Sequence, residues 1–327
     1  MLIGLKSIIR MILKSDKIYI AGHNGMVGSA IYRLLQNKGY TNLIGISSNM
    51  LDLKNQQKVF DFFEKEKPKV VINAAAKVGG ILANNEYPYN FIMDNMLIQN
   101  NLIESSLKNN VEKFIFLGSS CIYPKFAQQP LKEDYLLTDT LEPTNEWYAI
   151  AKISGVKTCQ AIRKQYGKDY VSLMPTNLYG THDNFDLKTS HVLPAMIRKF
   201  HEAKVNNDEN VTLWGSGTPM REFLFVDDMA SSVIFALENK LPEHLYNVGT
   251  GVDVTIKELA ETVKSIVGFE GDIIWDSTKP DGTPRKLMDI SKMHELGWKH
   301  KVELEQGIKT TYTWFKVNIE NIKEVKF

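Results

Sequence analysis

The fold is decided by one stretch near the N-terminus, Lys17-Ile18-Tyr19-Ile20-Ala21-Gly22-His23-Asn24-Gly25-Met26-Val27-Gly28. Its first five residues form a short β-rich run, and three glycines follow with the spacing G-x-x-G-x-x-G. Apolar residues at helical spacing continue from Val27 to Leu35, and Gly39 stops this pattern as a glycine after a helix does. A strand, a glycine-rich turn and a helix in this order are the context that a dinucleotide-binding motif requires.

Each glycine has a physical role in such a motif. Gly22 permits the tight turn, Gly25 lets the backbone approach a pyrophosphate, and Gly28 allows the helix to pack closely. The N-terminus of the helix then offers unpaired N–H groups and a positive dipole to the phosphates. The sequence therefore predicts a dinucleotide site at this turn.

The rest of the first half alternates between strands and helices. Strands are expected at 43–46, 70–73 and 114–117, and helices around 59–63 and over 89–107. Such alternation predicts parallel βαβ units, in a Rossmann-type doubly wound α/β sheet with helices on both faces. Small residues after the third strand, Ala74 to Ala76, suit either a passing cofactor or tight strand–helix packing.

Beyond about residue 180 the pattern changes. A helix is expected at 191–203, a strand at 211–214 and a helix at 256–267, separated by loops rich in Gly, Pro and Asp. We therefore expect an N-terminal extension over residues 1–14, a dinucleotide-binding domain over 15–180 and a smaller α/β substrate lobe over 181–327. Some of the chain after 180 is expected to cross back to the first domain.

Composition excludes several classes of protein. Lys plus Arg number 39 against 38 Asp plus Glu, so the charge favours neither a nucleic acid nor a membrane surface as partner. Two cysteines, Cys121 and Cys159, make no disulfide framework and have no metal-ligand spacing. Residues 1–13 carry Lys6 and Arg10 and are too short to span a bilayer, which needs about 20 apolar residues. A cytoplasmic protein without a metal site is expected.

Three polar residues in the first domain suggest redox chemistry at a carbonyl. Tyr148 and Lys152 are four apart and would share one face of a helix. We expect the ammonium to lower the pKa of the phenol, making Tyr148 a usable proton donor, and to hold the nicotinamide ribose. Ser119, after an earlier strand, could hydrogen-bond a substrate carbonyl. The glycine loop, Ser119, Tyr148 and Lys152 occur in the order typical of a short-chain dehydrogenase/reductase.

Other residues suggest proton transfer next to a ketone and binding of a nucleotide. A thiolate at Cys121, two residues after Ser119, could remove a proton next to a ketone. His191 could return a proton on the opposite face, although helix capping or a buried polar contact would also explain a histidine there. Arg221 suits a phosphate clamp or a surface ion pair, and Trp214 suits stacking on a base or packing in a core.

Several longer stretches resemble one family closely. They are residues 21–30, 74–81, 117–124, 141–146, 174–180, 214–222 and 279–286, and the Ser-Ser-Cys and Pro-Met-Arg-Glu segments within them are the most specific. From about Lys17 to Phe315 the chain resembles the GDP-L-fucose synthases, also called GDP-4-keto-6-deoxy-D-mannose 3,5-epimerase-4-reductases. These belong to the extended branch of the short-chain dehydrogenase/reductase superfamily.

The resemblance implies a bifunctional enzyme with NADP(H), a GDP-sugar substrate and a homodimeric assembly. Cys121 would be the base and His191 the acid that invert C3 and C5, while Tyr148 protonates the C4 oxygen with help from Ser119 and Lys152. GDP-sugar contacts would come from Lys199, Trp214, Arg221 and Asp281. Cofactor contacts would come from Gly22, His23, Asn24, Gly25, Met26, Val27, Gly28, Ser48, Asp52, Leu117, Gly118, Ser120, Lys152, Pro175, Thr176, Asn177, Leu178 and His191.

The chain departs from its relatives at two positions. Arginines that favour a 2′-phosphate in well-known relatives are replaced here by Asn24 and Ser48, so NAD(H) is an alternative cofactor. Asp52 could face the adenine or cap a helix. The rival enzymes, a 4,6-dehydratase or a 4-epimerase, are disfavoured because Ser120 and Cys121 stand where a dehydratase has an acidic pair. A non-catalytic regulator would not need Ser119, Tyr148 and Lys152.

Overall fold

A computed structural model describes residues 12–279 and 281–322 of the chain. Its larger sheet has six strands in the order β2-β1-β3-β4-β5-β9, and every neighbouring pair is parallel. This arrangement confirms the predicted doubly wound α/β fold. The strands are β1 (Ile18–Ala21), β2 (Leu43–Ile44), β3 (Val70–Asn73), β4 (Lys113–Leu117), β5 (Asp169–Pro175) and β9 (Leu245–Val248).

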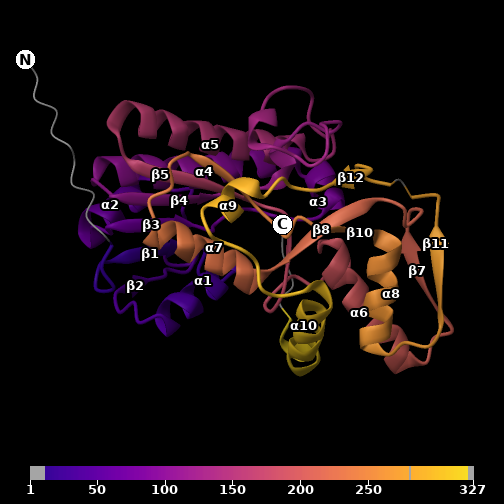
Figure 1. Ribbon diagram of the computed structural model, residues 1–327. Coiled ribbons are helices and arrows are strands. Elements are labelled where there is room, and N and C mark those ends of the chain that lie inside the picture. The colour runs from indigo at the N-terminus through magenta and orange to yellow at the C-terminus, as the bar shows by residue number, and fades with distance from the viewer. Residues whose placement is uncertain (1–11, 280, 323–327) are drawn as a thin grey trace, which may run out of the picture.

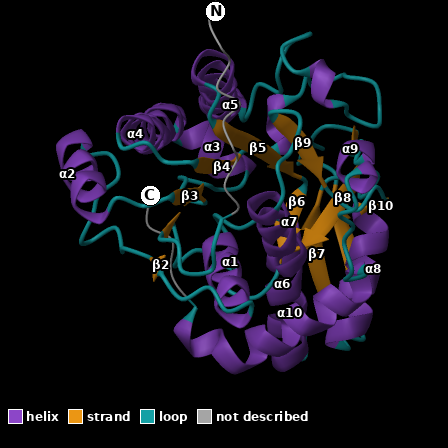
Figure 2. Cartoon of the chain, turned by 60° about the vertical axis from the view of Figure 1, so that its left-hand side comes forward, coloured by secondary structure: helices purple, strands orange, loops and turns teal. Residues whose placement is uncertain are grey.

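Helices cover both faces of this sheet (Figures 1 and 2). Successive strand residues point to opposite faces. Accordingly Ile18 and Ile20 join one apolar core with α1 and α7, whereas Tyr19 and Ala21 join the other core with α2, α4 and α5. Strands buried on both faces explain the continuous apolar runs in the sequence. The helices are α1 (Met26–Asn37), α2 (Gln56–Glu66), α4 (Pro88–Lys108), α5 (Glu146–Tyr166) and α7 (Val226–Glu238).

A second lobe lies beside the larger sheet, on the right in Figure 1. It has its own apolar core, which includes Phe200, Val263 and Phe315. Its helices are α6 (Val192–Asn206), α8 (Ile256–Val267) and α10 (Leu304–Asn318). Its strands are β6 (Asn177–Tyr179), β7 (Asn210–Trp214), β8 (Met220–Phe225), β10 (Asp253–Thr255), β11 (Asp272–Asp276) and β12 (Arg285–Lys286). The remaining short elements are α3 (Ile81–Glu86), α9 (Ser291–Glu295), η1 (Ser120–Ile122), η2 (Glu133–Tyr135) and η3 (Ile319–Asn321).

The expected crossing-back of the chain takes a specific form. After β8 the chain returns to the larger sheet as α7 and β9, and β9 becomes the edge strand beside β5. Residues 1–11 of the predicted extension lie outside the described residues. Residue 14 belongs to the fold instead, because the Lys14 carbonyl accepts a hydrogen bond from Thr41 N at 3.0 Å.

The glycine turn is as tight as the sequence requires. Gly22 has φ +81°, and a Cβ atom there would lie 2.8 Å from the backbone of Ala74 and Ala75. A Cβ on Gly28 would lie 2.1 Å from the Gly22 carbonyl oxygen, so Gly28 lets α1 approach the turn itself. The two glycines therefore hold β1, β3 and α1 in contact at one point.

We expect Gly22→Ala to destabilise the protein more than Gly167→Ala. Both glycines have positive φ, at +81° and +67°, but a Cβ on Gly167 would meet nothing within 4 Å. Both variants therefore carry backbone strain, roughly 1 kcal/mol, and only Gly22→Ala adds a steric clash of about 1–3 kcal/mol. Urea unfolding of both variants measures the difference, and equal losses would contradict this account of the turn.

Candidate active site

The carboxyl end of β4 begins the candidate site. The chain turns there into η1, and the Ser119 hydroxyl accepts a hydrogen bond from Cys121 N at 3.3 Å. This bond fixes Cys121 two residues beyond the strand, at the edge of the sheet where open α/β folds bind their ligands. Ser120 and Cys121 are both buried, whereas Ser119 is partly exposed.

Tyr148 and Lys152 reach the same edge from α5. The Lys152 ammonium donates a hydrogen bond to the Leu117 carbonyl at 2.8 Å and lies 5.6 Å from the centre of the Tyr148 ring. Lys152 is only 3% exposed. Because an ammonium has three donors, two remain beyond the bond to Leu117 to hold another polar group.

The prediction that Lys152 lowers the pKa of the Tyr148 phenol is wrong for this arrangement. The pKa of Tyr148 is raised, first by burial and then by the Cys121 charge, while burial lowers the pKa of Lys152 to about 8. The ammonium faces the Leu117 carbonyl and the tyrosine ring rather than pairing with a phenolate. Tyr148 is therefore protonated at neutral pH, which is the form that a proton donor needs.

Cys121 is electrostatically linked to this pair. Burial raises the pKa of its thiol, whereas the Lys286 ammonium, the Ser119 hydroxyl and the Lys152 ammonium act to lower it. The structure therefore brings Ser119, Cys121, Tyr148 and Lys152 together, as the sequence predicted. Cys159 is a free thiol too, but it is fully buried in the core between the sheet and α5.

His191 stands at the N-cap position of α6, but its side chain makes no capping hydrogen bond. The capping alternative therefore does not explain the histidine. Water reaches the residue, yet the surrounding protein desolvates the ring. This desolvation and then the charge of Lys286 lower the pKa of His191. The charge of the Lys286 ammonium thus lowers the pKa of both His191 and Cys121, against the effect of burial at Cys121.

Lys286 is the residue that sequence reasoning missed. It lies on β12 beside Arg221 of β8, and it lines a pocket together with Cys121, Glu142 and Asn145. The only signal was its place in the family-specific stretch over residues 279–286. A lysine in a polar loop more often points to solvent, so nothing in the local pattern indicated an inward position.

The nucleotide end of the site suits an anion. Gly25 is the N-cap of α1, and neither a capping side chain nor an acidic residue occupies the first turn. The free N–H groups of that turn are therefore available to phosphates. Nearby, the Asn73 amide nitrogen is buried and has no hydrogen-bond partner among the described residues. Both features fit a dinucleotide.

The residues expected around the adenosine end of the cofactor lie in different environments. Asn24 and Ser48 are exposed, and His23 is partly buried. The capping alternative for Asp52 is wrong, because the N-cap of α2 is Asn55, whose side chain accepts from Lys58 N at 3.0 Å. Asp52 instead accepts a hydrogen bond from Lys54 N, which closes a turn before that helix.

The segment from Pro175 to Leu178 joins the two lobes. Pro175 ends β5, and the side chains of Thr176 and Asn177 both donate hydrogen bonds to the Glu222 carbonyl, at 3.2 and 2.8 Å. The predicted cofactor-lining segment is therefore fixed directly to β8, the strand that carries Arg221.

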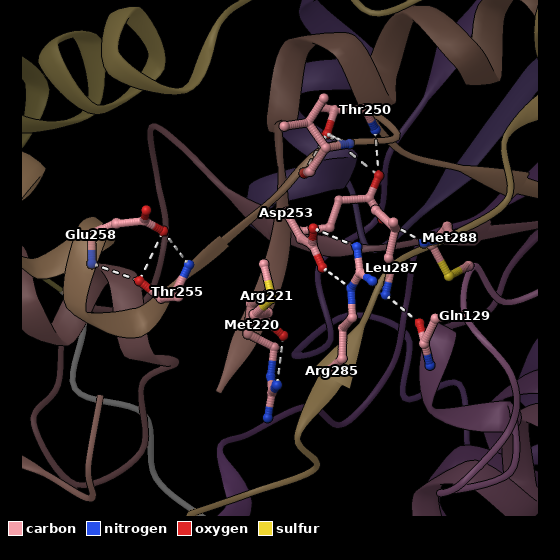
Figure 3. Close-up of polar contacts among 12 residues, drawn as sticks. Gln129, Met220, Arg221, Thr250, Asp253, Thr255, Glu258, Arg285, Leu287 and Met288 are labelled. Atoms are coloured by element: carbon pink, nitrogen blue, oxygen red, sulfur yellow. Dashed lines mark hydrogen bonds and ion pairs between the residues drawn. The ribbon is translucent and has the colours of Figure 1, made fainter. Parts of the chain in front are cut away.

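Glu222 also anchors the strand that follows the site. Its carboxylate is fully buried and accepts hydrogen bonds from the backbone N–H groups of Thr250, Gly251 and Met288. Figure 3 shows Thr250 and Met288 on either side of this contact. A buried carboxylate is stable only with such donors, so this residue ties β8, the turn after β9 and the segment after β12 into one unit.

The four predicted GDP-sugar residues all lie in the second lobe. Trp214 is 59% exposed, so the core alternative for it is wrong. Among the described residues no carboxylate comes within ion-pair distance of Arg221, which donates to the Met220 carbonyl at 2.7 Å (Figure 3). Asp281 accepts hydrogen bonds from Ser216 N and Oγ, and the Lys199 ammonium donates to the Thr212 carbonyl.

The chain is similar to known proteins over most of its length. The model of the NAD dependent epimerase/dehydratase family matches residues 18–249. The chain belongs to this family. A GDP-L-fucose synthase from Arabidopsis thaliana is 59% identical over 308 residues, which cover 94% of this chain and 95% of that protein. The family resemblance predicted from the sequence motifs is confirmed.

Two solved structures are also similar to this chain. A GDP-L-fucose synthetase from Naegleria fowleri bound to NADP has a TM-score of 0.89 and 28% identity, over 96% of this chain and 97% of its own. MlghC, a GDP-mannoheptose C4 reductase from Campylobacter jejuni with NADP bound, has a TM-score of 0.86 and 40% identity, over 93% of this chain and 99% of its own.

The site has no metal cluster, and the fold has no membrane-spanning helix, among the residues that the structure describes. Within residues 12–279 and 281–322, no group of three or more His, Cys, Asp or Glu side chains is placed to hold a metal ion. Over the same residues, no helix has the length and apolar character needed to cross a membrane.

Proposed function

We propose that this enzyme converts GDP-4-keto-6-deoxy-D-mannose into GDP-L-fucose by inverting C3 and C5 and then reducing C4 with NADPH. The observation that carries the proposal is the single cluster of Cys121 with Tyr148 and Lys152. It places a candidate base for proton abstraction beside a candidate proton donor for ketone reduction. The 59% identity to a GDP-L-fucose synthase supports the choice of substrate.

NADPH is the proposed reductant, bound with its pyrophosphate at the uncapped N-terminus of α1. Bound there, NADPH supplies a hydride to C4 of the sugar. Lys152 has two donors left for the ribose hydroxyl groups. Pro175, Thr176, Asn177 and Leu178 line the cofactor in this proposal, and so do Leu117, Gly118 and Ser120 at the end of β4.

Inversion needs a base and an acid on opposite faces of the sugar. The Cys121 thiolate takes the proton from C3 or C5, and the electron pair moves to the C4 oxygen as an enolate. Protonated His191 returns a proton to the carbon from the other face. The Tyr148 hydroxyl and the Ser119 hydroxyl stabilise the enolate by donating hydrogen bonds to its oxygen. Cys121 and His191 then regain their starting forms by proton exchange with solvent.

Reduction uses the same oxygen. Tyr148 transfers its phenol proton to the C4 oxygen as the carbon is reduced, while Lys152 holds the cofactor ribose beside it. The raised pKa of Tyr148 keeps it protonated until that moment. GDP is held by Lys199, Trp214, Arg221 and Asp281, with the guanidinium of Arg221 on the phosphates.

A C4 reductase without epimerase activity is the second candidate. It is suggested by the 40% identity to the GDP-mannoheptose C4 reductase MlghC. Such an enzyme would need Tyr148 and Lys152 but would have no use for a base at Cys121. The Lys286 charge acts on both Cys121 and His191, and this common influence favours the bifunctional reaction.

We further propose a cytoplasmic homodimer formed through α4 and α5. These helices pack side by side, and they expose Leu97, Trp147 and Ile150, at 39%, 39% and 36%. Large exposed apolar side chains on two neighbouring helices suit a subunit interface. The two free cysteines agree with a reducing compartment.

Cys121→Ser and Tyr148→Phe should separate the two half-reactions. A serine hydroxyl is far less acidic than a thiol, so Cys121→Ser should lose inversion by at least about a hundredfold, the usual worth of a general base, while ketone reduction survives in part. Tyr148→Phe should lose NADPH oxidation and retain hydrogen exchange at C3 and C5 in part, because Ser119 still donates to the enolate oxygen. Product analysis by NMR decides between these outcomes. Equal loss of both steps in both variants would contradict the division of labour.

The exposed, uncharged Asn24 and Ser48 should weaken the preference for NADPH over NADH. No positive charge at these positions binds the 2′-phosphate, so the ratio of kcat/KM values should be small. The double variant Asn24→Arg, Ser48→Arg should raise that ratio by adding charge-assisted hydrogen bonds. A preference of several hundredfold for NADPH in the unaltered protein would show that the idea is wrong.

Charges introduced at the exposed apolar residues of α4 and α5 should give a monomer. Leu97→Glu with Ile150→Glu places charges within the proposed interface, where burial without a partner is unfavourable. Val205→Glu, at an exposed apolar residue of α6, is the matched control. Light scattering should report a dimer for the unaltered protein and the control, and half that mass for the double variant. A monomeric unaltered protein would refute the assembly.

A further inference from the structure

Lys286 is held rigidly although its strand is only two residues long. On one side the Pro284 carbonyl accepts a hydrogen bond from Met220 N at 2.8 Å. On the other side Leu287 N donates to Gln129 Oε1 at 2.8 Å, and Met288 N donates to the buried Glu222 carboxylate at 2.9 Å (Figure 3). The backbone around Lys286 is therefore fixed from both directions.

The Lys286 ammonium has an unusual environment. Among the described residues it forms no hydrogen bond and no ion pair, although the side chain lines the Cys121 pocket. Its cationic neighbours in that pocket are paired: Lys125 lies 3.7 Å from Glu142, and Arg285 lies 2.6 Å from Asp253. A half-buried ammonium without a fixed partner leaves its charge free to act on groups that become negative in the site.

We propose that Lys286 is a positioning residue that stabilises the thiolate of Cys121 and thereby makes it a base. This inference deepens the proposed function and rests on it for the reaction that the thiolate serves. Lys286 itself touches no reacting atom in this account. It acts through the charge that a rigid strand holds beside the thiol.

The charges around Cys121 support this role. The groups that face the thiol are Ser119 from its own turn, Tyr148 and Lys152 from α5, and Lys286 from β12. After burial, which raises the pKa of the thiol, Lys286 is the strongest influence and lowers it. Burial lowers the pKa of Lys286, with a further decrease from Arg221, whereas the charges of Cys121 and Glu142 act to raise it.

The same ammonium acts on His191. In many cysteine–histidine pairs an imidazolium stabilises the thiolate. Here desolvation and then Lys286 lower the pKa of His191, so the neutral imidazole is favoured over the imidazolium. Lys286 therefore favours the basic form of Cys121 and makes protonated His191 the better proton donor.

The pH dependence of Cys121 alkylation tests the proposal without substrate. The protein, Lys286→Gln, Lys286→Met and Lys286→Arg are treated with iodoacetamide across a pH series, and the peptide containing Cys121 is quantified by mass spectrometry. Lys125→Gln is the matched control, because it removes a cation from the same pocket that is already paired with Glu142. Thermal melting checks that each variant is folded.

We expect the alkylation midpoint to rise by at least about one pH unit in Lys286→Gln and Lys286→Met, the usual effect of losing a nearby opposite charge. Lys286→Arg should restore the original midpoint, and Lys125→Gln should leave it unchanged. An unchanged midpoint in both uncharged variants would overturn the proposal. Equal shifts in Lys286→Gln and Lys125→Gln would overturn it too, because the thiol would then respond to the total positive charge of the pocket and not to Lys286 in particular.

The reaction provides the second measurement. Lys286→Gln should slow hydrogen exchange at C3 and C5 near pH 7 and regain the rate at higher pH, where the thiol ionises without help. If the unaltered protein shows no epimerase activity, the proposed function is wrong, and the alkylation series still tests the effect of Lys286 on Cys121. If the protein epimerises but the alkylation midpoint is the same with and without Lys286, only the inference about Lys286 is wrong.

Discussion

The hydrogen bond from the Lys152 ammonium to the Leu117 carbonyl joins the two segments on which the site depends. Leu117 ends β4, and Ser119 and Cys121 follow it directly, while Lys152 lies on the same helix as Tyr148. Because the bond lies in a buried setting, water does not compete for it, and its loss would leave an uncompensated buried charge. It therefore keeps the candidate base and the candidate proton donor at a constant spacing.

A second constraint couples the lobes. Glu222 binds Thr176 and Asn177 through its carbonyl, and Met288 through its carboxylate. The proposed cofactor-lining segment, the strand of Arg221 and the strand of Lys286 therefore share one buried anchor. This explains how residues distant in the sequence keep a common geometry around the proposed site.

Much of the fold could be predicted from the sequence because its signals are local. The glycine turn, the apolar strands and the periodic helices can each be predicted from the residues within them. For example, the helix expected at 256–267 has those bounds in the structure. The strand expected at 43–46 is shorter, because only Leu43 and Ile44 pair with β1. The division near residue 180 stays a prediction, although α7 and β9 show how the chain crosses back.

The site was predicted in part, for a physical reason. Motif spacing identifies Tyr148 and Lys152 because one helix carries both. Lys286 reaches Cys121 through pairing of β12 with β8, which depends on tertiary structure and leaves no periodic pattern. The direction of the pKa shift at Tyr148 depends likewise on burial and on where the ammonium points, and four-residue spacing does not specify either.

The most direct test of the account is the complete reaction in D2O. Purified protein is incubated with GDP-4-keto-6-deoxy-D-mannose and NADPH, and the product is identified by NMR. The account predicts GDP-L-fucose carrying solvent deuterium at both C3 and C5. A product reduced at C4 that keeps its original hydrogens and configuration at C3 and C5 would contradict it.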